Sequence, residues 1–154
     1  MLENEPHFSG FSQTKPFVFH ADTWGQVLPD DFANALIALA FHNPEKKARL
    51  CLHPSSSEIT QVTFLALAAP YRDKWHFHPE RPEIMIPIQG EADLSFLNEH
   101  TNQVTQVSMK QFVPISIEKK QIHSLHVIGD SFLFMEIGNG PFTANSTIFP
   151  ELNN

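Results

Sequence analysis

Short apolar runs separated by turn-forming residues fill the chain from residue 47 onward. They are rich in β-branched and aromatic residues, and Pro, Gly, Asn, Asp or Lys separate them. The runs are ARLCLH, EITQVTFLALA, DKWHFH, PEIMIPIQG, ADLSFLN, QVTQVSM, QFVPISI, QIHSLHVIG and SFLFMEIG. Strands repeating every ~8–12 residues are typical of a β-sandwich or a small barrel. No helical pattern interrupts them, which argues against a parallel α/β sheet.

One stretch before these strands has helical periodicity. In LPDDFANALIALAFHNP, residues 28–44, apolar side chains recur at helical spacing, and Asp30 or Asp31 can cap the first turn. Asn43-Pro44 ends the helix, because proline disfavours a helical residue before it. FVFH, residues 17–20, is a candidate strand, and the polar residues 1–16 are interpreted as a loose or docking arm.

The pattern predicts one all-β domain with an N-terminal helix. The divisions are an N-terminal arm at 1–27, the helix at 28–44, a β-barrel at 45–145 and a C-terminal tail at 146–154. A length of 154 residues suits one domain with a single core.

Charge and cysteine content exclude several classes of protein. The net charge of −7 and the lack of a basic run argue against binding to nucleic acid or to an anionic membrane. Cys51 is the only cysteine, so no internal disulfide can form. The first residues lack a signal-peptide pattern, and no apolar stretch is long enough to span a membrane. A cytoplasmic location is therefore predicted.

The stretch KWHFHPERPE, residues 74–83, contains the candidate chemistry. In an extended strand, His76 and His78 share one face, with α-carbons about 7 Å apart. The prolines that follow predict a constrained turn that can bring Glu83 back beside them. The alternation after His123 directs that side chain into the core. Three imidazoles and a carboxylate suit one divalent ion, either Zn, Fe, Mn or Ni, in a site with open positions, although an HxH pair alone is more often structural.

These residues resemble a known motif. HFHPERPEIMIPIQG fits the first cupin motif, with His76, His78, Glu83 and Gly90 in place. The second cupin motif falls at EKKQIH, where His123 matches but the usual Pro and Gly are absent. The resemblance implies a cupin-type double-stranded β-helix, a jelly-roll barrel, with these three histidines and Glu83 as metal ligands.

A longer stretch, about residues 30–142, resembles the WbuC family of cupin-fold metalloproteins. The matching features are the strand ARLCLH, the metal motif and the ending FLFMEIGNGPF. Arg81 and Pro82 stand where that family commonly has Lys and Ser. The resemblance implies an association with bacterial surface-polysaccharide genes and implies no particular reaction.

Four further residues are candidates for substrate chemistry. Arg49 and His53 share a strand face with Cys51, and a guanidinium can bind an anionic substrate. Arg81 is a second candidate for substrate binding. Glu136 lies in an apolar strand, where a carboxylate is costly unless it faces a polar cavity. Glu136 and His53 are the predicted catalytic residues, with surface positions as the alternative.

Three functions remain open at this point. The first is isomerase- or epimerase-type chemistry on a small sugar or sugar-nucleotide-like substrate, with the metal as a Lewis acid. The second is an Fe(II) oxygenase of the cupin type, and the third is a module that binds a small molecule without turnover. A homodimer is a further expectation, because pairing covers exposed sheet edges.

Overall fold

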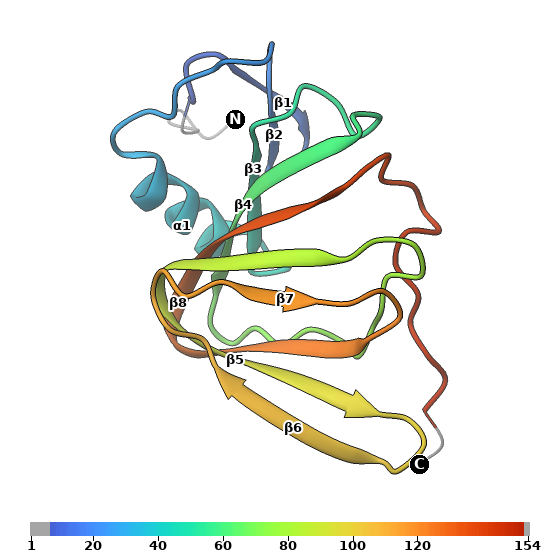
Figure 1. Ribbon diagram of the computed structural model, residues 1–154. Coiled ribbons are helices and arrows are strands. Elements are labelled where there is room, and N and C mark those ends of the chain that lie inside the picture. Colours follow the sequence, from blue (N-terminus) through green and yellow to red (C-terminus); the bar gives the residue numbers. More distant parts are fainter. Residues whose placement is uncertain (1–6, 153–154) are drawn as a thin grey trace.

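One bent sheet and one helix make up the computed structural model, which describes residues 7–152 (Figure 1). The strands are β1 Phe11–Lys15, β2 Val18–Ala21, β3 Lys47–Cys51, β4 Thr60–Ala68, β5 Glu83–Asn98, β6 Gln103–Ser108, β7 Ile115–Ile117 and β8 Ile122–Asn139. The helix is α1, Phe32–His42. The sheet runs β1-β2-β3-β4-β8-β5-β6, and β7 pairs with β5.

Alternation along the central strands gives this sheet two buried faces. In β4, Phe64, Ala66 and Ala68 pack toward α1, whereas Leu65 and Leu67 point into the barrel. The neighbouring strand β8 does the same, because its Leu133 joins the helix-side core and its Phe132 and Phe134 join the barrel core. A period of two therefore divides one continuous apolar run between two separate cores.

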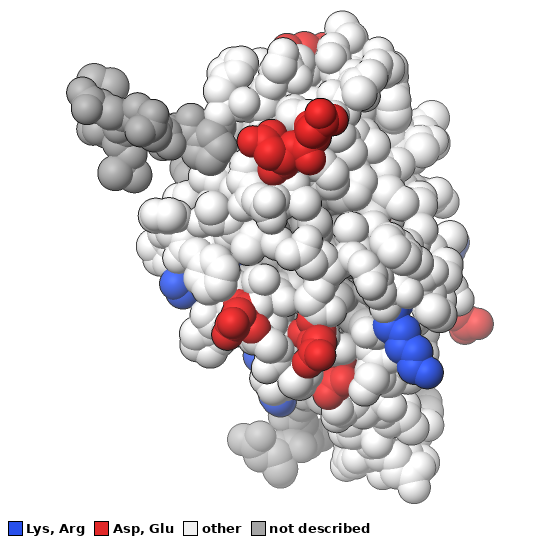
Figure 2. Space-filling view, turned by 90° about the vertical axis from the view of Figure 1, so that its left-hand side faces the viewer, with Lys and Arg blue, Asp and Glu red and all other residues white. Residues whose placement is uncertain are grey.

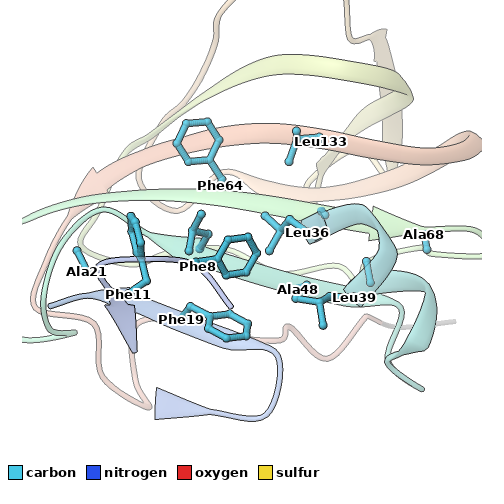
Figure 3. Packing of buried hydrophobic residues seen from close by; sticks show 13 residues of the cluster. Phe8, Phe11, Phe19, Ala21, Leu36, Leu39, Ala48, Phe64, Ala68 and Leu133 are labelled. Carbon is cyan, nitrogen blue, oxygen red and sulfur yellow. The ribbon is translucent and has the colours of Figure 1, made fainter. Parts of the chain in front are cut away.

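The helix-side core is built from α1 and the N-terminal strands (Figure 3). Leu36, Leu39 and Ala40 of α1 are buried against the sheet. Phe8 meets Phe19 edge to face, with ring centroids 5.0 Å apart. The helix is shorter than the predicted span 28–44.

Of the two interpretations of residues 1–16, a loose or a docking arm, the structure agrees with docking for the part that it describes. Phe8 and Phe11 are buried, and β1 forms a hairpin with β2. The strand β2 then runs parallel to β3, so this segment extends the barrel sheet. Residues 1–6 lie outside the described residues. The polarity of Ser12, Gln13 and Thr14 suggested a loop, but these residues belong to an exposed edge strand.

Two long strands lie next to each other in the sheet. β5 and β8 pair over most of their lengths, with irregularities between Pro87 and Gln89 and between Gly90 and Ala92. Gly90 has φ +87°, and a β-carbon there would collide with the carbonyl oxygen of Ser131. The motif glycine is therefore required at the bend, where an L side chain would be strained and would clash.

The strand predictions are right in position and partly wrong in extent. PEIMIPIQG and ADLSFLN form the single strand β5, and QIHSLHVIG and SFLFMEIG form β8. The segment DKWHFH is not a regular strand, since it makes only isolated bridges, His76 with His123 and Phe77 with Ile148. Pro79 and Pro82 follow within a few residues, which limits the ladder hydrogen bonds that this segment can form.

Truncation of Leu36 tests the contribution of the helix-side core. Leu36→Ala should lower the free energy of unfolding by about 2–5 kcal/mol, because Leu36 is fully buried and its loss leaves a cavity. Phe41→Ala on the exposed side of α1 is the control and should cost less than about 1 kcal/mol. Denaturant titration measures both, and equal losses would contradict this account of α1.

Candidate metal centre

The barrel interior opens into a cavity of about 860 Å³ with both polar and apolar walls. Its walls combine apolar side chains of β4 and β8 with charged and imidazole groups, a composition typical of small-molecule sites. The residues singled out from the sequence that line it are Arg49, His53, His76, His78, Arg81, Glu83 and Glu136. His123 is 1% exposed and lies directly against this wall, with its ring centroid 4.3 Å from that of His76.

The three motif histidines converge, although they come from two distant segments. His76 and His123 form an antiparallel bridge, with backbone hydrogen bonds of 3.1 and 2.9 Å in the two directions. His78 follows two residues later, and its ring centroid lies 5.3 Å from that of His76. One nitrogen from each of the three rings lies within 4.8 Å of the other two.

All three rings are oriented by the backbone in the same way. In each, Nδ1 lies 2.8 Å from a carbonyl oxygen and donates its hydrogen to it. The acceptors are Lys74 O for His76, Ser146 O for His78 and Gln121 O for His123. This tautomer leaves the Nε2 lone pair of each ring free, which is how metal-ligating histidines are commonly held.

The free nitrogens of His78 and His123 face a carboxylate and not a hydrogen-bond donor. Nε2 of His78 is 3.2 Å from Glu83 Oε1, and Nε2 of His123 is 3.8 Å from Glu83 Oε2. Nε2 of His123 is buried without a hydrogen-bond partner. Lone pairs that face one another in a buried site repel unless a cation or a proton lies between them. The donor set therefore fits a divalent ion.

The histidines differ in how readily they take that proton. Burial, followed by the nearby charge of His76, lowers the pKa of His123 to about 4, so His123 is neutral at pH 7. Burial also disfavours the His78 cation, but the hydrogen bond and negative charge of Glu83 outweigh it and raise the pKa of His78. Glu83 has a lowered pKa, because its contacts with His78 and Arg81 outweigh its burial.

A buried arginine links Glu83 to the second carboxylate of the cavity. Nη2 of Arg81 lies 3.3 Å from Oε1 of Glu83 and 3.3 Å from Oε1 of Glu136. Its guanidinium carbon lies 5.2 Å from the centre of the Phe142 ring. A β-carbon at position 138 would overlap this guanidinium, so Gly138 provides the space for it. Arg81, predicted to bind substrate, is thus already paired with two carboxylates.

Glu136 lies in the cavity wall with 22% of its side chain exposed. Burial and the negative charge of Glu83 raise its pKa to about 7, although Arg81 and Arg49 oppose the change. A carboxyl group with such a pKa holds or releases a proton near neutral pH, which a general acid or base requires.

Arg49 on β3 and His53 just after β3 line the same cavity. This agrees with the shared strand face predicted for them from the sequence. His53 lies beside His20 and Cys51, away from the three motif histidines. His20, at the end of the candidate strand FVFH, lies on β2, opposite Cys51 of β3. Only the parallel β2–β3 register reveals this neighbour, and single-sequence periodicity does not give that register.

Comparison with solved structures identifies the fold. CapF from Staphylococcus aureus, a capsular polysaccharide assembling protein, aligns with a TM-score of 0.60 at 13% identity, over 71% of this chain and 33% of its own. A recombinant oxalate oxidase in complex with glycolate gives 0.57 at 16% identity, over 70% and 56%. Oxalate decarboxylase from Lactobacillus farciminis gives 0.56 at 18% identity, over 70% and 32%.

These proteins share the cupin fold, so the chain is an all-β protein of the cupin type, a double-stranded β-helix. The chain spans between about a third and three fifths of the length of these three proteins. It matches no protein-family model and no curated protein. Among residues 7–152, no helix has the length and apolar character needed to cross a membrane.

Metal affinity should depend on pH through His78. Its raised pKa lets protons compete for Nε2 near neutrality, so affinity should fall by up to about tenfold per unit as the pH drops from about 8 to about 6. His123 should not contribute to this competition until near its pKa of about 4. Calorimetric titration with Zn²⁺ at several pH values measures the effect.

The metal-free protein should show the opposite trend. The ion pair of His78 with Glu83 stabilises the fold below the unfolded-state pKa of about 6.5 and is lost as the pH rises through the higher folded-state pKa. Zn²⁺ should therefore raise the melting temperature more at about pH 8 than at about pH 6. A pH-independent affinity or melting shift would contradict the role assigned to His78.

Proposed function

We propose that the chain is a metal-binding protein of the cupin superfamily, related to the WbuC family. His76, His78, His123 and Glu83 hold one divalent ion, either Zn, Fe, Mn or Ni. The observation that carries this proposal is the shared orientation of the three rings, whose Nδ1 atoms are all bonded to backbone carbonyls, while the Nε2 atoms of His78 and His123 face Glu83. Structural histidines have no need for a common free tautomer around one carboxylate.

The four ligands leave room for a substrate. An ion that accepts six ligands keeps two positions for oxygen atoms of a bound molecule. When bound, the ion supplies Lewis-acid polarisation of a carbonyl or hydroxyl oxygen. Arg81 keeps one oxygen of Glu83 occupied, and Phe149 lies beside His76, with ring centroids 6.1 Å apart. These two residues limit the space through which a substrate would reach the metal position.

The proposed substrate is a small polar molecule of the sugar or sugar-nucleotide class, handled in surface-polysaccharide metabolism. Support comes from the cationic side chains in the cavity, since Lys47 and Arg49 line it from β3 and can bind anionic oxygens. The fold similarity to CapF, described as a capsular polysaccharide assembling protein, points in the same direction. A cytoplasmic location and a homodimer stay predictions.

Glu136 is the proposed proton carrier. It lies on the cavity wall, its pKa of about 7 allows both protonation states, and Arg81 holds its orientation. Transfer of a proton between carbon and oxygen atoms of the substrate is the isomerase- or epimerase-type step that such a group can perform. His53 lies closer to Cys51 and His20, so Glu136 is the stronger candidate.

Loss of one ligand tests the metal site. His76→Ala should reduce bound metal at this centre by at least about tenfold, because it removes one of three imidazole ligands from a partly exposed position. His126→Ala is the matched control, since His126 pairs with Arg72 away from the three motif histidines. Elemental analysis after equilibration with Mn²⁺, a metal with little preference for sulfur, measures the content. Equal metal content in both variants would refute this ligand set.

Replacement of Glu136 tests the proposed chemistry. Nucleotide sugars and keto sugars are incubated with the metal-loaded protein in D₂O, and NMR follows exchange at carbons next to carbonyl groups. Glu136→Gln should slow the exchange by about 10²–10⁴-fold while metal content is unchanged. Glu99→Gln, in an exposed turn, is the control. Unchanged exchange in Glu136→Gln would exclude Glu136 as the proton carrier.

The donor set also fits an Fe(II) oxygenase, which remains the alternative enzyme. Consumption of O₂ by the Fe²⁺-loaded protein with the same sugars, without deuterium exchange, would favour it. Tight ligand binding with neither reaction would favour the non-catalytic binding module.

A further inference from the structure

A second group of metal-ligating side chains lies in the same cavity, outside the centre already described. His20, Cys51 and His53, here called the thiol cluster, place one ligand atom each within 4.8 Å of the other two. His20 and Cys51 are cross-strand partners on β2 and β3, and His53 follows Cys51 by two residues. The His20 and His53 rings meet edge to face, with centroids 5.4 Å apart.

Contacts at the Nδ1 atoms orient the two histidine rings of the thiol cluster. Nδ1 of His20 lies 2.8 Å from Oγ1 of the Thr14 side chain. Nδ1 of His53 lies 3.1 Å from both the backbone nitrogen and the backbone oxygen of Val62. In the tautomer whose Nδ1–H donates to the Val62 oxygen, Nε2 of His53 is free. Contacts of this kind at the distal nitrogen are those that orient metal-ligating histidines.

Packing alone gives an incomplete account of Cys51. Its thiol has one contact of hydrogen-bond type, from Thr63 Oγ1 at 3.6 Å, and lies within 4.8 Å of a ring nitrogen of both His20 and His53. Burial lowers the pKa of both His20 and His53, so both rings are neutral ligands at pH 7. Burial raises the pKa of Cys51 to about 11, so a bound cation would have to displace the thiol proton.

The spacing of the cluster suits a small cation. Zn–N bonds of about 2.0–2.1 Å and Zn–S bonds of about 2.3 Å put tetrahedral ligands roughly 3.3–3.8 Å apart. Ligand atoms within 4.8 Å reach this spacing through small side-chain rotations. Three protein ligands leave the fourth position open to the cavity that all three residues line.

The thiol cluster is separate from the first centre. His20, Cys51, Thr63 and Glu136 are successive cross-strand partners on β2, β3, β4 and β8, and all of them line the cavity. Cys51 and Glu136 are therefore two strand spacings apart, about 10 Å between their α-carbons. Ions at the two positions would share no ligand, because the two groups have no residue in common.

We propose that His20, Cys51 and His53 form a second metal site for a thiophilic divalent cation of the Zn²⁺ class. Its open fourth position holds water or an anionic oxygen of the molecule in the cavity. This site does not depend on the proposed function, because none of its ligands belongs to the first centre.

Titration with Co²⁺ separates the two sites, because only the thiol cluster contains sulfur. The reduced wild-type protein should bind two Co²⁺ per chain and develop a near-ultraviolet thiolate-to-cobalt charge-transfer band, which excess Zn²⁺ removes. Cys51→Ser should bind one Co²⁺ without the band. His76→Ala should lose the other ion and keep the band.

Three outcomes would overturn the proposal: absence of the band in the reduced wild-type protein, two Co²⁺ per chain in Cys51→Ser, or loss of the band in His76→Ala. If Cys51→Ser does not fold, as judged by circular dichroism, His20→Ala replaces it. His20 is only partly buried. In His20→Ala, the affinity for the Co²⁺ ion that gives the charge-transfer band should fall by at least about tenfold. An intact band in His76→Ala with no Co²⁺ lost would refute the first centre alone and leave the thiol cluster supported.

Discussion

The structure depends on one constraint, the alternation of side chains along strands whose two faces are both buried. In β3, β4 and β8, one parity packs under α1 and the other faces the barrel. The helix-side parity is apolar at Phe64, Ala66, Ala68 and Leu133. The barrel-side parity changes from Leu65 and Phe134 to Thr63 and Glu136 toward one end. The strand register that packs one face into a hydrophobic core therefore also places polar side chains of the other face in the cavity.

The charges around Glu83 are paired with one another inside the cavity. The face of the molecule in Figure 2 displays more acidic than basic side chains, in keeping with the net charge of −7. Inside, Arg81 lies between two carboxylates, and His78 contacts one of them. Removing one partner would leave a buried charge uncompensated, which costs several kcal/mol. The position of the Arg81 guanidinium in turn requires Gly138, because a β-carbon there would overlap it.

Much of the fold was readable from local pattern, and the failures have physical causes. The spacing of HPERPE and the parity of His123 place those side chains around one point, because the turn and the alternation are short-range features. The joining of separate apolar runs into the long strands β5 and β8 could not be predicted from the sequence. Bends at Gly90 and its neighbours look like strand ends there. His20 was missed because its partner, Cys51, lies across a parallel pairing that depends on the whole sheet.

The carbonyl of Ser146 orients His78 from 68 residues further along the chain. Ile148 then bridges to Phe77, between the two histidines of the motif. The arrangement of these rings is consequently a long-range property, completed only when the segment after β8 has docked. During synthesis, the motif emerges well before the residue that orients His78, so the arrangement of the three rings is completed late in folding.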